Sequence, residues 1–156
     1  MLREFLRNWS PRVDSPGALR QSGALPYAVV DGRMAVLLVT SRRTGKWIFP
    51  KGAIEPDMTA WDSAAKEALE EAGVLGTIDP GLLGTYRSTG GPDGITAIDV
   101  ELYPLRVTQQ LSEWREQGER LRHWATVREA RRLLVDPALG RLVTLLQARV
   151  ATAARI

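Results

Sequence analysis

Three glutamates near the end of one short predicted helix are the residues best suited to chemistry. Glu67, Glu70 and Glu71 lie within five residues of one another, and a helix that turns by about 100° per residue brings them onto one narrow face. This face is predicted to point mostly away from the core, with Glu71 nearest its edge. Carboxylate oxygens are ligands that Mg²⁺ prefers. The spacing therefore indicates a divalent-cation site, although an acidic helix surface neutralised by arginines has the same spacing.

The electrostatics of this helix favour a bound cation. Glu67 and Glu71 are like charges four residues apart, and Glu70 and Glu71 lie in the last turn. The negative end of the helix dipole disfavours carboxylates there, and each effect costs a few tenths of a kcal/mol. A Mg²⁺ or Mn²⁺ ion held by the three acids would offset both.

The residues around the acids stand at the spacing of the Nudix box, in which a glycine precedes an acidic helix by a loop of fixed length. The matching positions are Gly52, Glu67, Glu70, Glu71, Gly73 and Val74. The chain thus resembles a Nudix hydrolase. The resemblance implies an α/β fold, a Nudix-type α/β/α sandwich with a mixed β-sheet between helices. It also implies catalysis by the three glutamates, with the backbone carbonyl of Lys51 as a further metal ligand.

Two positions depart from the box. Met58 stands where the family usually has a glutamate, and Lys66 where it usually has an arginine. In the family this pair ties the loop to the helix, so we expect weaker anchoring here, with Glu55 as an acid that could substitute. A wider resemblance over residues 21–134, including the Trp-Ile-Phe-Pro-Lys-Gly segment at 47–52, is to bacterial relatives of diphosphoinositol polyphosphate phosphohydrolases.

The remaining sequence predicts one domain behind a short arm. Residues 1–22 are predicted to be a loosely structured arm, and residues 23–156 a single hydrolase domain. Apolar segments predict strands over 24–30, 34–40, 46–49, 84–89 and 96–107, with a hairpin turn at Asp31 and Gly32 and a loop over 51–58. Helices are predicted from Thr59 to Gly73, over 127–134 and from Pro137 onward.

Alternation along the strand at 96–107 predicts one buried and one exposed face. Ile98, Val100 and Leu102 are expected inside, and Asp99, Glu101 and Tyr103 outside. Glu101 is therefore one candidate for a general base outside the box. Glu116 and Glu119 are the alternatives.

Basic residues before the box are candidates for holding phosphate groups, because guanidinium forks grip phosphate in bidentate fashion. The substrate-binding candidates are Arg20, Ser41, Arg42, Arg43, Lys46 and Lys51. Relatives acting on highly phosphorylated inositols bring further cations from the turn that corresponds to residues 90–94. This turn has no cation here and contains Asp93. Trp47, Trp114 and Trp124 are candidates for stacking on a base, although core packing explains them more simply.

These observations predict a metal-dependent pyrophosphohydrolase that cleaves a diphosphate linkage in a nucleoside or dinucleoside polyphosphate. Two alternatives stay open. One is a diphosphoinositol polyphosphate phosphohydrolase. The other is a non-catalytic Nudix-fold module that binds a nucleotide or a protein, which the changes at Met58 and Lys66 suggest.

Composition argues against several other classes. The chain has no cysteine and one histidine, His123, which argues against thiol nucleophiles and His-based or Cys-based metal clusters. No apolar run reaches the roughly 18 residues of a membrane helix, and residues 1–14 lack the apolar core of a signal peptide. We therefore expect a cytoplasmic protein with a small phosphorylated substrate and no membrane partner. The sequence contains no basic stripe with interleaved aromatic residues, so it does not favour nucleic-acid binding. It does not predict the oligomeric state.

Overall fold

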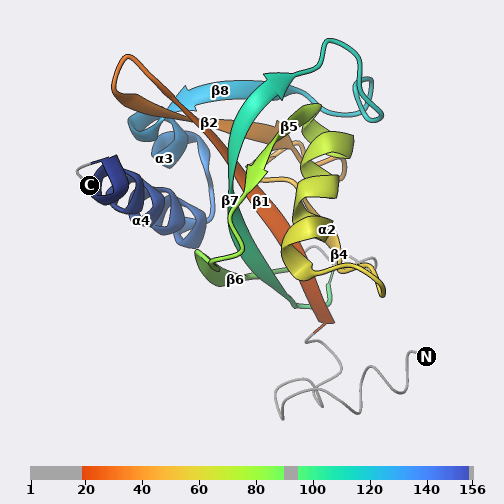
Figure 1. Cartoon of the computed structure of the whole chain (residues 1–156). Coiled ribbons are helices and arrows are strands. Elements are labelled where there is room, and N and C mark those ends of the chain that lie inside the picture. The colour runs from red at the N-terminus through yellow and green to blue at the C-terminus, as the bar shows by residue number, and fades with distance from the viewer. Residues whose placement is uncertain (1–18, 90–94, 155–156) are drawn as a thin grey trace.

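A twisted mixed β-sheet lies between one helix on one face and two helices on the other (Figure 1). The structure is a computed structural model and describes residues 19–89 and 95–154. Eight strands form the sheet: β1 (Leu19–Val30), β2 (Arg33–Thr40), β3 (Trp47–Ile48), β4 (Lys51–Ala53), β5 (Val74–Ile78), β6 (Gly84–Ser88), β7 (Ile98–Gln110) and β8 (Arg122–Thr126).

The long strands β1 and β7 run side by side at the centre of the sheet and are parallel. The main order is β3-β2-β1-β7-β5, with β4 paired to β1, β6 to β7 and β8 to β2. All these other pairs are antiparallel, so the predicted mixed sheet is confirmed. The predicted hairpin is confirmed as well, because Asp31 and Gly32 both have positive φ angles, of 52° and 75°.

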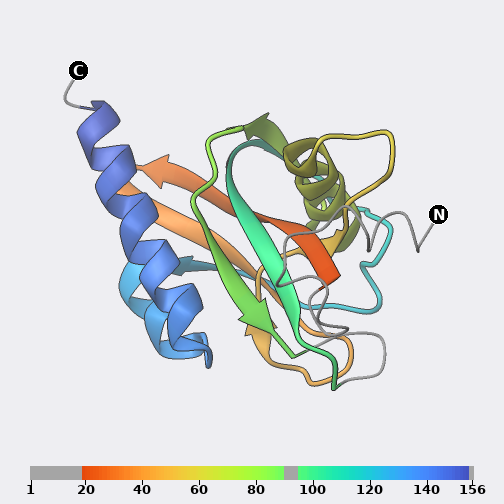
Figure 2. The same ribbon diagram turned by 90° about the horizontal axis from the view of Figure 1, so that it is seen from below.

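The helices cover both faces of the sheet, as Figures 1 and 2 show. Helix α2 (Ala60–Glu67) lies on one face and continues into the π-helical turn η1 (Ala68–Ala72). Helices α3 (Val127–Leu133) and α4 (Pro137–Ala154) lie on the other face. The predicted α/β/α sandwich is therefore confirmed. Within the described residues, no helix is both long and apolar enough to cross a membrane.

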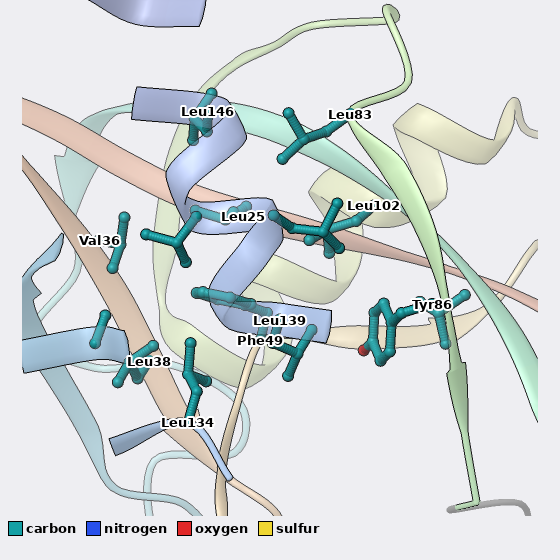
Figure 3. Close-up of a cluster of buried hydrophobic side chains, with 14 of the residues drawn as sticks. Leu25, Val36, Leu38, Phe49, Leu83, Tyr86, Leu102, Leu134, Leu139 and Leu146 are labelled. Atoms are coloured by element: carbon teal, nitrogen blue, oxygen red, sulfur yellow. The ribbon is translucent and has the colours of Figure 1, made fainter. Parts of the chain in front are cut away.

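Two apolar clusters fill the spaces between the sheet and the helices. The larger cluster joins β1, β2, β6 and β7 to α3 and α4, with Leu25, Phe49 and Leu146 among its fully buried members (Figure 3). The smaller cluster lies under α2, where Ala64, Ala68 and Ala72 allow close contact with the sheet. Helix α2 and the turn η1, which contain the three glutamates, therefore pack closely on the sheet.

Burial on β7 differs from the predicted alternation. Ile98, Val100 and Leu102 are buried as expected, but Asp99 and Tyr103 are buried as well, at 4% exposure each. For Tyr103 the cause is α2, which places Trp61 edge-on against it with ring centroids 6.1 Å apart. The prediction assumed that the polar positions of the strand face solvent, and this assumption fails where the strand is covered on both faces.

Several element boundaries also differ from the predictions. Strand β1 begins at Leu19 and pairs with β7 from that residue, so the end of the predicted arm belongs to the sheet. The predicted loop after Pro50 begins with β4, which pairs with β1. Strands β5 and β8 were not predicted, because each is only five residues long and follows or precedes a helix directly. The predicted turn at residues 90–94 and residues 1–18 lie outside the described residues.

The segment 111–122 caps the end of the acidic helix. Its groups donate to four consecutive helix-end carbonyls: Glu116 N to Glu70 O at 3.1 Å, Trp114 Nε1 to Glu71 O at 3.1 Å, Arg122 Nη1 to Ala72 O at 2.9 Å and Leu111 N to Gly73 O at 2.8 Å. The last carbonyls of a helix have no partner within the helix. Capping from a distant segment therefore fixes the position of the acids relative to the sheet.

We predict that Trp114→Phe lowers the free energy of unfolding by about 1–2 kcal/mol, because it removes the bond to Glu71 O and weakens the stacking of Arg122 on the ring. The guanidinium of Arg122 lies 3.8 Å from the Trp114 ring centroid. Trp124→Phe is the matched control, since its indole N–H bonds the exposed side chain of Gln110. Urea unfolding measures both, and an equal loss in the two variants would contradict the capping role.

Candidate active site

An open cavity of about 720 Å³ brings the box residues together with the basic residues that precede them. Its acidic residues are Glu67, Glu71, Glu116 and Asp136, and its basic residues include Arg42, Arg43, Lys46, Lys51 and Arg120. What we call the α4 end of the cavity consists of Trp47, Tyr86, Val135, Asp136 and Leu139. Acid, cation and apolar groups therefore line one space.

Glu71 is the most deeply buried acid of the site, at 4% exposure. The prediction placed it at the edge of an outward-facing surface, but segment 111–122 covers the helix end. Its carboxylate accepts from the backbone N–H of Lys51 at 3.4 Å and lies 3.4 Å from Arg120 Nη2. Burial raises the pKa of Glu71 to about 8, outweighing the opposing attraction of Arg120, and the nearby Glu67 raises it further.

Glu67 is close to Glu71, and Gly52 makes room for its carboxylate. A Cβ built on Gly52 would clash with the Glu67 carboxylate. This clash explains why the box has a glycine at this position. Burial raises the pKa of Glu67, while a hydrogen bond with Glu71 lowers it. Two carboxyl groups that are both hard to ionise share one corner of the cavity.

Glu70 does not join them. Its side chain bonds Arg115 Nη1 at 2.9 Å and lies 3.4 Å from Lys66 Nζ, and it does not line the cavity. The widened turn η1 changes the angular positions that a regular helix would give. Over residues 19–89 and 95–154, no group of three or more His, Asp and Glu side chains is arranged to hold a metal. Glu67 and Glu71 lie together at the cavity, and the role of Glu70 as a metal ligand stays a prediction.

The donors that remain fit a hard cation. Mg²⁺ is usually held by one or two protein carboxylates, with water and substrate phosphate completing its shell. Ala24 N donates to Pro50 O at 3.0 Å, so the next residue, Lys51, projects its N–H and its carbonyl away from β1, on the side of Glu71. Glu67, Glu71 and this carbonyl present oxygen ligands at the cavity.

The loop of the box is tied to the helix by a different pair from the family's. Lys66 Nζ donates to Glu55 Oε1 at 3.0 Å, so the tether that Met58 cannot make is made three residues earlier. Glu55 N also donates to Ser63 Oγ at 3.0 Å. The expected weakening of the loop is thus offset by Glu55, the residue noted as a possible substitute.

The predicted phosphate-binding residues divide into two groups. Ser41, Arg42, Arg43, Lys46 and Lys51 all line the cavity. Arg20 does not, and its guanidinium instead binds the carboxylate of Glu101, with Nε 2.8 Å from Oε2. Within the cavity, Arg42 is paired to Glu119 at 3.0 Å. Arg43 and Lys46 have no ion pair among the residues that the structure describes.

Of the three candidates for the general base, only Glu116 lines the cavity. Glu101 does not line the cavity, and its carboxylate is bonded by Arg20 and by the Tyr103 hydroxyl at 2.8 Å. Glu119 is half exposed and lies outside the lining. Glu116 lines it, and its carboxylate accepts from Arg120 Nε at 2.9 Å.

Sequence reasoning missed Arg120, Tyr86 and Asp136 in this site. Arg120 joins Glu71 to Glu116 and donates to Thr40 O at 2.9 Å. No motif marks it, because it reaches the acids from a segment 49 positions further along the chain. Tyr86 reads as an ordinary strand residue and Asp136 as a helix cap, so neither pattern signals the cavity.

Comparison with known proteins gives matches over most of the chain. A profile described as "NUDIX domain" matches residues 20–146. Nudix hydrolase 17, mitochondrial, of Arabidopsis thaliana is 36% identical over 121 residues, covering 73% of this chain and 65% of the relative. Diphosphoinositol polyphosphate phosphohydrolase 3-alpha of Homo sapiens is 30% identical over 129 residues, covering 81% and 76%. The chain spans 63% of the length of two other plant relatives, Nudix hydrolases 12 and 13.

Solved structures share the fold at lower identity. A Caenorhabditis elegans Ap4A hydrolase in a binary complex has a TM-score of 0.68 and 22% identity, covering 86% of this chain and 98% of the other. The NUDIX domain of Shewanella oneidensis NrtR, complexed with ADP ribose, has a TM-score of 0.67 and 17% identity, covering 96% and 99%. Identities this low extend the similarity to the fold alone.

We predict that Glu71→Gln lowers turnover by at least about 10²-fold, equivalent to roughly 2.7 kcal/mol in the barrier, because it removes the negative charge of a predicted cation ligand. Glu113→Gln, on an exposed side chain of the capping segment, is the matched control. Near-normal turnover of Glu71→Gln on the best substrate would contradict the assignment.

The same variant has a pH signature in metal-free protein. The pKa of Glu71 is raised in the folded chain to about 8 from 4.5, so folding keeps a proton that the unfolded chain loses, and stability falls as pH rises through this window. The glutamine side chain of the variant has no such proton to lose. With a chelator present, the variant should therefore melt at least about 3 °C above the parent at pH 8, and the gap should narrow at pH 5. A constant gap would contradict the raised pKa.

Proposed function

We propose a substrate class for this chain from two premises. The chain belongs to the Nudix hydrolase family, whose domain profile matches residues 20–146, and it is a hydrolase of phosphoric anhydride bonds. The proposed substrate is a nucleoside or dinucleoside polyphosphate. The observation that supports it is the cavity, which combines basic side chains, an acid pair and an apolar end in one space.

We further propose that Glu67, Glu71 and the Lys51 carbonyl hold a Mg²⁺ or Mn²⁺ ion. Bound there, the ion would neutralise phosphate charge and lower the pKa of a bound water molecule. The short separation of the two carboxyls, both with raised pKa, supports this role, since a cation removes the cost of ionising them together. Glu70 would act through Lys66 and Arg115, as a positioning residue.

Arg43, Lys46 and Lys51 would bind the phosphate chain. Arg43 and Lys46 have no ion pair in the part of the chain that the structure describes, so their charge is available to a ligand. The role of Arg42 would be indirect, because Glu119 and Glu116 already lie 3.0 Å and 3.7 Å from its guanidinium.

We propose Glu116 as the general base in place of Glu101. Its carboxylate lines the cavity beside the acid pair and is oriented by Arg120 at 2.9 Å. A base needs hydrogen-bond reach to the proton that it takes. The position of Glu101 favours it less, since it lies outside the lining and is already bonded to Arg20 and Tyr103.

The diphosphoinositol alternative draws support from the human relative of that name. The chemistry of the cavity argues against it. An inositol that bears many phosphates needs cations around its whole ring, whereas the α4 end of the cavity offers Trp47, Val135 and Leu139, with the negative Asp136. The sequence of residues 90–94 likewise contains no cation.

The non-catalytic alternative rests on Met58 and Lys66. The pair of Glu55 and Lys66 weakens it, because the loop keeps a tether to the helix. The plant relatives are named as mitochondrial, so they lend no support to the expected cytoplasmic location, which stays a proposal.

The function is tested by incubating the purified chain with Mg²⁺ and a panel of nucleoside, dinucleoside and inositol polyphosphates, and by measuring released phosphate and nucleotide products. We expect kcat/KM for a dinucleoside polyphosphate to exceed that for a diphosphoinositol polyphosphate. A clear preference for the inositol compound would overturn the proposed substrate.

We predict that Arg43→Ala raises KM for the preferred polyphosphate several-fold at low salt and by less at high salt, because salt already screens the contact in the parent. Arg33→Ala, at the end of the exposed β1–β2 hairpin and outside the cavity lining, is the matched control. The measurement is KM at two ionic strengths. An equal effect at both would indicate that Arg43 does not contact the phosphates.

A further inference from the structure

The hydroxyl of Tyr86 is a buried polar group with no hydrogen-bond partner in the described structure. The residue is 6% exposed and belongs to the larger apolar cluster, and Figure 3 shows its ring at the edge of that cluster with the hydroxyl on the side of Leu139. Tyr86 and Leu139 both line the cavity. A buried donor without a partner costs about 1–3 kcal/mol, and a ligand atom in the cavity would remove this cost.

An acceptor accompanies this donor at the α4 end of the cavity. Asp136 lines the cavity and caps α4, with one carboxylate oxygen accepting from Ala138 N at 2.9 Å. Its second oxygen has no partner among residues 19–89 and 95–154. Burial raises the pKa of Tyr86, and Asp136 and Glu71 add to the rise. The phenol therefore stays a donor, on a wall where Asp136 is an acceptor.

We propose that Tyr86 and Asp136 form a binding site for a hydroxyl group of the substrate, namely a sugar hydroxyl of its nucleoside. A hydroxyl both accepts and donates, so it matches one O–H donor beside one carboxylate acceptor. This inference rests on the proposed function and deepens it.

The surroundings favour a sugar over another phosphate. Asp136 would repel a phosphate, and Arg87, the cation contributed by the same strand as Tyr86, is paired to Asp99 at 3.2 Å. Trp47 and Leu139 offer apolar surface in the same region, since both belong to or pack on the cluster that holds Tyr86. Apolar surface with a few placed polar groups is typical of a nucleoside site.

The test compares Tyr86→Phe with the parent by calorimetric binding of adenosine 5′-monophosphate and of its 2′-deoxy and 3′-deoxy forms. Losing one hydrogen bond should weaken binding of the ribonucleotide about five-fold. At least one deoxy form should bind parent and variant equally, since it lacks the hydroxyl that Tyr86 contacts. Tyr103→Phe, whose hydroxyl bonds Glu101 outside the cavity lining, is the matched control.

Stability separates a ligand contact from a hidden structural one. Without ligand, Tyr86→Phe should melt at the parent's temperature or above, because it removes an unpaired buried hydroxyl. A lower melting temperature, an unchanged affinity for the ribonucleotide, or an equal loss for all three nucleotides would overturn the inference.

The proposed function can fail separately. If the panel shows no hydrolysis of any nucleoside polyphosphate, the function is wrong, and ribose 5-phosphate with 2-deoxyribose 5-phosphate then repeats the binding test. Discrimination between these sugars that Tyr86→Phe abolishes would support the hydroxyl site alone. Failure of every one of these probes to bind the parent would overturn it.

Discussion

The burial of the Glu71 carboxyl governs the rest of the site. Taking a carboxylate out of water is costly unless a cation or hydrogen bonds compensate, and the fold supplies compensation from several distant segments. Arg120 reaches the acid from the segment after β7, and the Lys51 N–H reaches it from β4. Four donors of residues 111–122 hold the helix end from which it projects. The pKa of Glu71 nevertheless stays high, so charge compensation in the described protein is incomplete. A divalent cation would complete it.

The same constraint divides the cavity. Cations that pair with protein acids, such as Arg42 and Arg120, hold the walls together and have little charge left for a ligand. Arg43 and Lys46 are unpaired within the described residues and are therefore the ones we assign to phosphate. The α4 end combines apolar surface with a carboxylate, which suits an uncharged organic group. A substrate that joins phosphate groups to a nucleoside matches this combination of side chains.

Local patterns predicted what depends on local physics. The hairpin at Asp31 and Gly32 and the start of the acidic helix at Thr59 follow from local backbone geometry, and both were predicted correctly. Contacts between distant segments could not be predicted from local patterns. The ion pairs of Arg120 with Glu71 and of Arg115 with Glu70 depend on where residues 111–122 fold back onto the helix. The burial of Tyr103 on β7 was missed for the same reason, because Trp61 of α2 packs against it. The tether of the loop lay between these cases. The sequence suggested Glu55 as the acid that replaces the one missing at Met58, and the structure showed that its partner is Lys66.

The most direct test of the acid pair as a cation site is a titration with Mn²⁺ followed by electron paramagnetic resonance, on the parent and on Gly52→Ala. The added Cβ meets the Glu67 carboxylate, whereas Gly118→Ala, where a Cβ meets nothing within 4 Å, is a matched control. The account predicts saturable Mn²⁺ binding in the parent and in Gly118→Ala, weakened at least about ten-fold in Gly52→Ala, the equivalent of about 1.4 kcal/mol. Equal binding by all three proteins, or no saturable site in the parent, would contradict it.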